Sequence, residues 1–360
     1  MPYLEYSLGA FGAFVCAWVL VALWIRVSVR ARIVDIPNAR SSHARVTPRG
    51  GGVAIVATVV LGVGVALATG HAEDLQGALW AGGLGIFIAS VSFIDDVRSL
   101  PSSLRLVLQT LASGVTVWKL GAFPTVTLPF LEPLVLPLWV MTVLTVVWII
   151  GLTNVYNFMD GIDGIAGGQG LVAGLAWAWF GVMAQEPLVG WAGGIIAAAC
   201  LGFLLHNWSP AKVFMGDVGS AFLGFAFAVL PLLALHGRAV EVEWPLPVIG
   251  AVPVFGALVV WPFIGDGVFT FLRRVKHGEN LLSAHRSHLY QRLTIANWPH
   301  ATVSRLYIWW AVVCAMCGVL YLRSGHMERF IVLGGCAYSV IAVYHLVKRA
   351  EDRLGSEGRR

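Results

Sequence analysis

Long apolar segments recur along the whole chain and are separated by short polar segments. Each is long enough, or nearly long enough, to cross the roughly 30 Å hydrocarbon layer of a membrane as a helix. We count eleven segments, with ten as the alternative because the fourth and fifth are short. The segments lie at about 7–28, 51–69, 77–94, 104–120, 137–152, 164–184, 189–206, 218–236, 246–265, 302–322 and 329–347. This pattern predicts an all-α polytopic membrane protein.

The composition indicates the same class of protein. Hydrophobic residues make up 58% of the chain and charged residues only 12%, against about 25% charged in an average soluble domain. No internal repeat and no low-complexity linker divides the chain, so we expect one transmembrane domain over residues 1–360. No basic residue precedes the first apolar segment, although a cleaved signal peptide would require one. We therefore expect this segment to be retained, with its N-terminus outside.

Charge divides the loops into two faces. If the chain starts outside, the loops at 29–50, 95–103, 153–163, 207–217 and 266–301 and the C-terminal tail share the opposite face. All Lys and Arg residues lie on that face except Lys119, Arg238, Arg323 and Arg329, so the positive-inside rule makes it cytoplasmic. All aspartates except Asp74 lie there too. Carboxylates at a membrane boundary indicate a functional site on this face.

Two adjacent aspartates, Asp95 and Asp96, end the third apolar segment. The C-terminal end of a helix is already the negative end of its dipole, so a positive group must offset these carboxylates. Consecutive helical residues point about 100° apart. One carboxylate could therefore face a reaction centre while the other holds a backbone amide or an arginine such as Arg98. An ordinary acidic loop is the alternative.

The segment "TNVYNFMDGIDGIAGG" places Asn157, Asp160 and Asp163 three residues apart. This spacing would put them on one face if the segment is helical, while its glycines would let a ligand approach the backbone. A glycine-rich segment for helix packing is the alternative. The later segment "MGDVGS" joins Asp217 to a helix start, which suits Mg²⁺ and phosphate together. Here the alternative is that Asp217 only caps the helix.

Two inner loops are basic. The first carries Arg40, His43, Arg45 and Arg49 before three glycines, and the last carries "RRVKHGENLLSAHRSHLYQRL". Such residues suit phosphate groups, although contact with lipid headgroups alone is the alternative. Because aspartates favour a hard cation, His288 is expected to act as a phosphate donor rather than as a zinc ligand.

Read together, five motifs resemble the polyprenyl-phosphate N-acetylhexosamine-1-phosphate transferases, glycosyltransferase family 4. The motifs are "DIPNARSSH", "FIDDV", "NVYNFMDGIDGIAGG", "VFMGDVGS" and "HRSHL", in family order and on one face. The resemblance implies transfer of a sugar 1-phosphate from a UDP-sugar to undecaprenyl phosphate, with release of UMP and with Mg²⁺ or Mn²⁺ as cofactor. It also implies a bacterial inner membrane protein with a cytoplasmic active site, contact with membrane lipids, no nucleic-acid partner, and a homodimer as an open alternative to the monomer.

The resemblance also implies roles for particular residues. Asp95 and Asp96 match the catalytic acidic pair, which is tied to deprotonation of the lipid phosphate, and Asp217 matches the metal ligand. Arg49 and Arg286 are expected to bind phosphate. The positions implied for nucleotide-sugar binding are Asn157, Asp160, Asp163, Asn207, Phe214, Arg45 and His288, with Phe214 as the stacking partner of uracil.

The last loop departs from the family pattern. Relatives often carry "HxHH" or "HHH", whereas this chain has His288, Leu289, Tyr290 and Gln291. The departure argues against a muramoyl-pentapeptide substrate and indicates an N-acetylated 6-deoxyhexosamine that starts O-antigen synthesis, with N-acetylglucosamine as the alternative. A transporter is the rival class, but its polar residues should lie at mid-membrane rather than at one face. Which aspartate is the base, and whether an aspartyl-phosphate forms, stay open.

Overall fold

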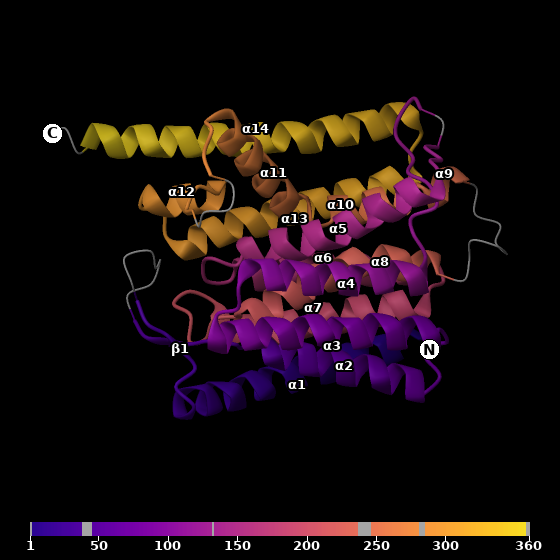
Figure 1. Cartoon of the computed structure of the whole chain (residues 1–360), viewed down its shortest axis with the longest axis horizontal. Coiled ribbons are helices and arrows are strands. Elements are labelled where there is room, and N and C mark those ends of the chain that lie inside the picture. Colours follow the sequence, from indigo (N-terminus) through magenta and orange to yellow (C-terminus); the bar gives the residue numbers. More distant parts are fainter. Residues whose placement is uncertain (1, 38–44, 132, 237–245, 281–284, 358–360) are drawn as a thin grey trace.

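The computed structural model describes residues 2–37, 45–131, 133–236, 246–280 and 285–357. Most of its helices run between the same two ends of one bundle (Figure 1). Within the described residues, eight helices are long and apolar enough to cross a membrane. These are α1 (Pro2–Arg30), α3 (Leu75–Arg98), α5 (Leu138–Phe158), α6 (Ile165–Met183), α7 (Pro187–Asn207), α8 (Asp217–Leu235), α13 (His300–Arg323) and α14 (His326–Glu357). The prediction of an all-α polytopic membrane protein is confirmed.

Two further helices, α2 (Gly52–Ala68) and α4 (Ser102–Leu120), lie beside these eight and match the second and fourth apolar segments. The helix α2 is apolar but has only 17 residues, and α4 carries Arg105 and Lys119. Every apolar segment of the sequence thus coincides with helix. The number of crossings stays a prediction, because length and hydropathy alone identify eight spans, or nine if one bent pair is counted.

The ninth predicted segment, 246–265, is not one continuous helix, and whether it forms part of a single broken span stays a prediction. It is divided into α9 (Leu246–Ile249), α10 (Ala251–Leu258) and the start of α11 (Trp261–Lys276), and α10 and α11 are bent by 80°. Pro262 lies in the first turn of α11. Proline lacks the N–H that would continue the preceding helix but fits a first turn, so a new helix begins there. As a result α11 extends into the predicted loop 266–301, which also contains the short helix α12 (Leu289–Ile295).

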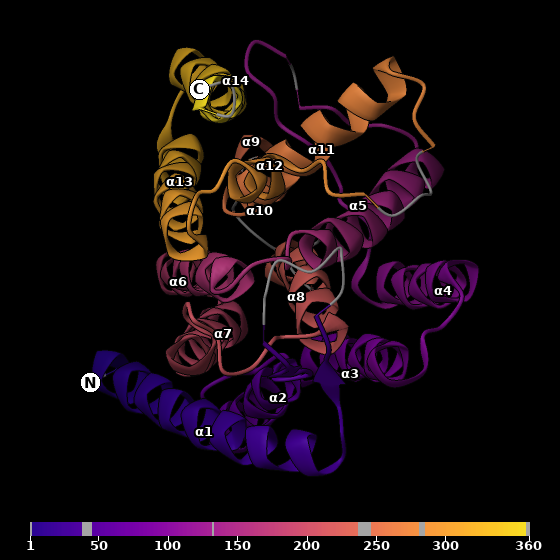
Figure 2. The ribbon, with the colours of Figure 1, turned by 90° about the vertical axis from the view of Figure 1, so that its left-hand side faces the viewer.

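The loops that carry the polar motifs gather at one end of the bundle, where β1 (Val34–Asp35) and β2 (Thr47–Pro48) form a short antiparallel ladder (Figure 1). Viewed from this end, α8 lies in the centre of the molecule (Figure 2). It is also the most buried of the candidate spans. A Cβ on Gly52 would lie 2.3 Å from the Cα of Gly219, so glycine lets α2 and α8 begin side by side.

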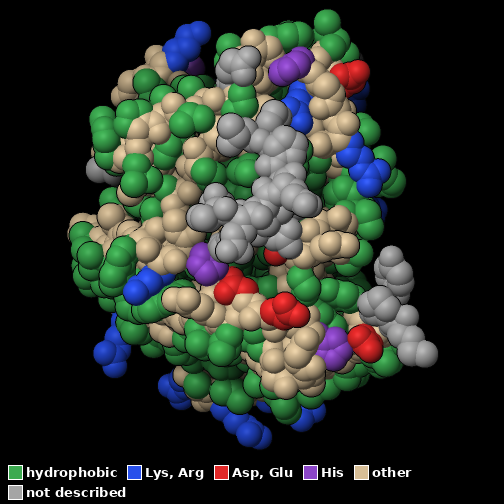
Figure 3. All heavy atoms as spheres, turned by 90° about the vertical axis from the view of Figure 1, so that its right-hand side faces the viewer, with side chains coloured by type: hydrophobic (Ala, Val, Ile, Leu, Met, Phe, Trp, Pro, Cys, Tyr) green, Lys and Arg blue, Asp and Glu red, His purple; other side chains and the backbone are tan. Residues whose placement is uncertain are grey.

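The opposite end carries acidic and histidine side chains among apolar ones (Figure 3). Two ion pairs lie there: His71 with Glu5, at 3.1 Å, and His236 with Asp74, at 2.8 Å. The second pair joins the start of α3 to the end of α8, and the other ends of these two helices carry the acidic motifs.

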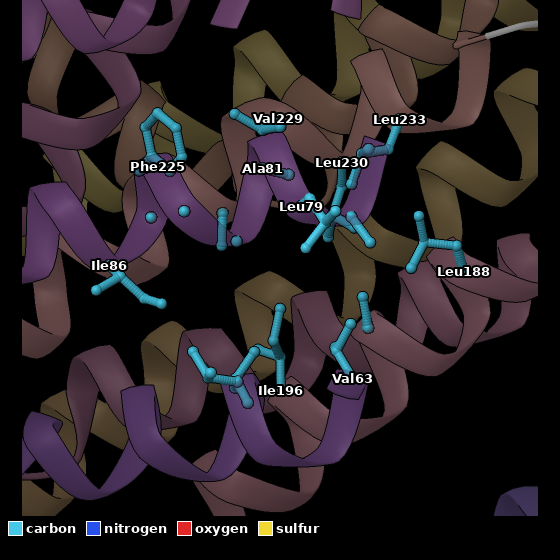
Figure 4. A pocket seen from close by; sticks show the side chains of 18 of the residues that line it. Val63, Leu79, Ala81, Ile86, Leu188, Ile196, Phe225, Val229, Leu230 and Leu233 are labelled. Atoms are coloured by element: carbon cyan, nitrogen blue, oxygen red, sulfur yellow. The ribbon is translucent and has the colours of Figure 1, made fainter. Parts of the chain in front are cut away.

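An apolar cavity of about 350 Å³ lies between α2, α3, α7 and α8 (Figure 4). Its lining includes Val63, Leu79, Ile196, Phe225 and Leu233, and no charged side chain of the described residues belongs to it. A site for a nucleotide needs polar groups that fix the orientation of the ligand. This cavity suits hydrocarbon only, so the candidate active site lies elsewhere, among the polar loops.

Candidate active site

Aspartates from three helix ends meet beside the start of α8. Asp95 and Asp96 lie in the last turn of α3, and Asp217 is the first residue of α8. Asp160 follows α5 by two residues and lies close enough for its ionisation to be affected by Asp96 and Asp217. The structure thus brings together four carboxylates that the sequence analysis assigned to the site, and their roles stay a prediction.

The Asp96 carboxylate caps α8. Its two oxygens accept the backbone N–H groups of Asp217, at 3.0 Å, and Val218, at 3.1 Å. Arg49 contacts the same carboxylate at 2.8 Å, and the Asp96 side chain is fully buried. A Cβ on Gly216, whose φ is +75°, would lie 2.7 Å from an Asp96 oxygen, so the turn before α8 requires glycine. Asp96 therefore joins α3 to α8 at the positive end of the α8 dipole.

Asp95 has a different environment. One of its oxygens accepts the backbone N–H of Leu100 at 2.6 Å, and the other lies 2.5 Å from a guanidinium nitrogen of Arg105. The sequence suggested Arg98 as the partner, but the arginine of the next helix, α4, makes this contact. The Asp95 side chain keeps 9% exposure.

Two arginines and one asparagine surround Asp217. Arg49 bridges Asp217, at 3.0 Å, and Asp96, while Arg105 lies 3.5 Å from the second oxygen of Asp217. Asn157, in the last turn of α5, donates to Ser220 of α8 at 2.9 Å and lies within hydrogen-bonding reach of Asp217. The start of α8 is therefore held by the ends of α3 and α5 and by the segment before α2.

The two aspartates of the "DGIDG" turn, Asp160 and Asp163, lie in different environments. Burial raises the pKa of Asp160 to about 8; the Asp217 carboxylate adds to this shift, and Arg49 opposes it. Asp163 instead accepts the backbone N–H of Ala211, at 3.2 Å, and lies 3.5 Å from His300 of α13. Burial alone would raise the pKa of Asp163, but the hydrogen bond and charge of His300 and the Ala211 N–H lower it.

The expected common face of Asn157, Asp160 and Asp163 was wrong, because α5 ends at Phe158 and the next residues form a turn. The positive φ of Gly164, +79°, belongs to this turn. Only the first two of the three residues lie beside Asp217.

Asn207 and Phe214 hold loops together through hydrogen bonds. The buried Asn207 amide accepts from the backbone N–H of Gly164 and donates to the carbonyl of Val213, both at 2.9 Å. The backbone N–H of Phe214 donates to Pro48 at 2.8 Å, and its carbonyl accepts from Gly51 at 2.9 Å. Because both polar atoms of the Asn207 side chain are engaged within the protein, this residue stabilises the loops of the site. The half-buried Phe214 ring as a partner for uracil stays a prediction.

The other predicted basic residues differ in exposure. Arg45 is exposed and Arg286 is half-buried, whereas Arg40 and His43 lie outside the described residues. His288 is buried, and its Nδ1 lies 3.2 Å from the Asp266 carboxylate. The rings of His285 and His288 lie tilted to each other, with centroids 5.0 Å apart. Burial, together with the nearby His288 and Arg274, lowers the pKa of His285 to about 4, so this ring is neutral at pH 7.

The sequence interpretation missed Arg105, Asp266 and Tyr290. Arg105 was counted among the basic residues but was given no partner, because nothing local in the sequence brings α4 onto Asp95. Asp266 was assigned to a loop, but it is a fully buried carboxylate in α11. A charged residue at the end of an apolar segment was the available signal for it.

The charges of the site leave room for a divalent cation. Among the described residues, two guanidinium groups, those of Arg49 and Arg105, contact the cluster of Asp95, Asp96, Asp160 and Asp217, so these two groups leave two negative charges unbalanced when all four carboxylates are ionised. Asp95 and Asp217 also lie within hydrogen-bonding reach of each other, which requires a proton or a cation between two carboxylates. Among the described residues, no three His, Cys, Asp or Glu side chains are placed to hold a metal by themselves. Mg²⁺ usually binds one or two carboxylates and completes its shell with water and substrate phosphates, and Asp217 and Asp95 could supply such ligands.

The site therefore combines four carboxylates with two arginines at one end of a helical membrane bundle. The sequence profile of glycosyl transferase family 4 matches residues 77–235. A probable undecaprenyl-phosphate N-acetylglucosaminyl 1-phosphate transferase of Bacillus subtilis is 31% identical over 293 residues, which cover 76% of this chain and 73% of the relative. A decaprenyl-phosphate N-acetylglucosaminephosphotransferase of Mycolicibacterium smegmatis is 27% identical over 362 residues, 91% of this chain and 86% of the relative.

A shorter match joins the chain to a phospho-N-acetylmuramoyl-pentapeptide-transferase of a Synechococcus species, 36% identical over 140 residues, or 38% of each protein. The chain belongs to glycosyl transferase family 4, the polyprenyl-phosphate N-acetylhexosamine-1-phosphate transferases, and it is an enzyme of that family. The resemblance inferred from the five motifs is confirmed.

Proposed function

We propose that this enzyme transfers N-acetylglucosamine 1-phosphate from UDP-N-acetylglucosamine to undecaprenyl phosphate, releases UMP, and starts a lipid-linked surface glycan. The acidic cluster around the start of α8 is the observation that carries the proposal. Of the two sugar classes that the sequence left open, the relatives favour N-acetylglucosamine over a 6-deoxyhexosamine, because those that align over most of the chain are named for it. The match to the muramoyl-pentapeptide enzyme covers a much smaller part of the chain.

The two adjacent aspartates suit different tasks. Asp96 has three donors on a buried carboxylate, so it fixes the start of α8. Asp95 is the proposed general base: it keeps some exposure and lies against Arg105. It takes the proton from the lipid phosphate, and the freed oxygen attacks the phosphorus that carries the sugar. The bond to the α-phosphate breaks, and UMP leaves with the electron pair.

Arg49, Arg105 and Asp217 would hold the charged groups of the two substrates in place. Catalysis of phosphoryl transfer consists mainly of positioning and electrostatic stabilisation. Mg²⁺ or Mn²⁺ bound at Asp217, with Asp160 and Asp95 nearby, would offset the negative charge of the diphosphate. Asp160, with its pKa near 8, carries a proton at neutral pH when no cation is present and would release it when one binds.

The proposal is tested by release of UMP from a panel of UDP-sugars with purified protein and undecaprenyl phosphate. We expect UDP-N-acetylglucosamine to give the highest kcat/KM, by at least about tenfold, since a site built to bind particular hydroxyl and amide groups rejects analogues strongly. A higher value for a UDP-linked 6-deoxyhexosamine would reverse the choice of sugar. No UMP release with any sugar, together with movement of a solute across vesicles, would favour the transporter.

We further propose that the site faces the cytoplasm across a bacterial inner membrane. The exposed residues Ser102 and Gln185 lie near opposite ends of the bundle, at the start of α4 and just after α6. A membrane-impermeant thiol reagent added to intact cells should label a cysteine at position 185, and should label one at position 102 only after the inner face is opened. The reverse pattern would overturn the orientation.

A further inference from the structure

A fully buried carboxylate, Asp266, lies in α11 outside the acidic cluster. One oxygen accepts the backbone N–H of Leu289, at 2.9 Å, and the Thr270 hydroxyl, at 3.0 Å. The other accepts the backbone N–H of Tyr290, at 3.2 Å, and the Tyr307 hydroxyl, at 2.7 Å. A buried carboxylate is stable only when donors of this kind surround it. Asp266 thus ties together α11, α12 and α13.

The fifth partner of Asp266 is the ring of His288, whose Nδ1 lies 3.2 Å away. Four other groups donate to the same carboxylate, so it acts as an acceptor, and Nδ1 must carry the proton. The remaining ring nitrogen, Nε2, is then the one left for other partners. His288 is also the N-cap of α12, and its backbone N–H donates to the side chain of Gln291 at 3.3 Å. Asp266 therefore fixes both the imidazole and the first turn of α12.

The segment held by Asp266 packs directly on the candidate active site. The Tyr290 hydroxyl donates to the carbonyl of Phe158, the last residue of α5, at 3.1 Å. A Cβ on Gly161 would lie only 2.1 Å from the same hydroxyl. Asn157 and Asp160 flank this contact in the sequence. Any shift of α12 would therefore move the turn that carries Asp160.

We propose that Asp266 is the positioning residue for the sugar-nucleotide part of the site: it orients His288 and seats α12 against the turn at 158–161. The proposal rests on the proposed function and on the contact with the nucleotide-sugar that the sequence resemblance implies for His288. Asp266 has no contact with the acidic cluster and acts through the residues that it holds.

The test separates positioning from a general loss of stability. UMP release is measured with varied UDP-N-acetylglucosamine and, separately, with varied undecaprenyl phosphate, for Asp266→Asn and His288→Asn. Asparagine at position 288 places an amide near the Nδ1 site, so it keeps the bond to Asp266 but has nothing at Nε2. We expect both variants to raise the KM for the UDP-sugar at least about tenfold and to change the KM for the lipid less than about twofold. Thr270→Val, which removes a donor to Asp266 that lies within α11 itself, is the matched control and should stay within about twofold of wild type.

The double variant decides whether Asp266 acts through His288. If it does, Asp266→Asn combined with His288→Asn should be at most about twofold worse than the worse single variant. Effects that multiply, or that raise both KM values equally, would overturn the proposal. If Asp266→Asn does not fold, Tyr307→Phe takes its place, because it removes only one of the five hydrogen bonds to Asp266. We expect Tyr307→Phe to raise the KM for the UDP-sugar about two- to tenfold. An unchanged KM would contradict the proposal.

A second measurement does not depend on turnover. Amide hydrogen exchange over residues 285–295 should be faster in Asp266→Asn than in wild type, and unchanged in Thr270→Val. If wild type releases no UMP with any sugar, the proposed function fails, but this measurement still tests whether Asp266 holds α12 in place. If wild type is active and Asp266→Asn keeps its KM for the UDP-sugar, the positioning role alone fails.

Discussion

Asp217→Asn should reduce UMP release at least about 100-fold and leave the protein folded in the membrane. Removing one group that stabilises charge in a transition state costs about 10² to 10³ in rate. Asp217 faces Arg49 and Arg105 and lies within reach of Asp95. The amide would keep the shape of the side chain but remove the charge that a divalent cation needs. Arg49 would still be paired with Asp96, so the start of α8 should hold.

The control makes the same chemical change at the other end of the same two helices. Asp74→Asn weakens the pair with His236 and the cap of α3, so it should lower stability slightly and leave UMP release near wild type. Mg²⁺ should raise the melting temperature of wild type and of Asp74→Asn but not of Asp217→Asn. Near-normal turnover of Asp217→Asn at ordinary Mg²⁺ concentrations would remove Asp217 from the site.

Hydropathy predicted where helices lie but not how they bend. A helix must present about 20 apolar residues to cross the hydrocarbon layer, so the segments stand out in the sequence. The run from Val252 to Ile264 is equally apolar on both sides of the break between α10 and α11, and hydropathy carries no information about direction. Only Pro262 signalled the break, through its missing N–H.

The members of the site were easier to predict than their partners. Aspartates stood out because nearly all of them fell in loops on one face of a chain that is otherwise poor in charge. Their partners depend on which helices pack together, and a sequence does not contain that information locally. For this reason Arg105, and not the expected Arg98, contacts Asp95. The spacing of Asn157, Asp160 and Asp163 predicted a common helix face, but α5 ends between the first and the second of these residues.

The adjacent aspartates should fail in different ways when each is replaced by asparagine. Asp95→Asn should fold normally, because its partners are one backbone N–H and the half-buried Arg105, and should lose about 10² to 10⁴ in rate, the usual contribution of a general base. Raising the pH should restore part of this loss, since a lipid phosphate that is already ionised needs no base. The measurement is kcat for UMP release between pH 6 and pH 9.

Asp96→Asn should instead weaken the junction of α3 and α8. Its carboxylate accepts two N–H groups at the start of α8 and pairs with Arg49, and an amide can accept only part of this set. We expect a loss of about 1–3 kcal/mol in the free energy of unfolding, seen as a lower melting temperature, together with lost activity. High pH should not restore this activity, because the defect lies in the position of Asp217 rather than in a proton transfer.

The two pH profiles decide between the roles. If activity recovers at high pH in Asp96→Asn but not in Asp95→Asn, the two residues exchange roles and Asp96 is the base. The three donors to the buried Asp96 carboxylate argue against this outcome. Recovery in neither variant, with both substrates still bound, would mean that the lipid phosphate loses its proton without help from this pair. Asp95 would then serve as an electrostatic group or as the nucleophile of an aspartyl-phosphate route, and trapping of a phosphorylated enzyme with UDP-sugar alone would separate those two roles.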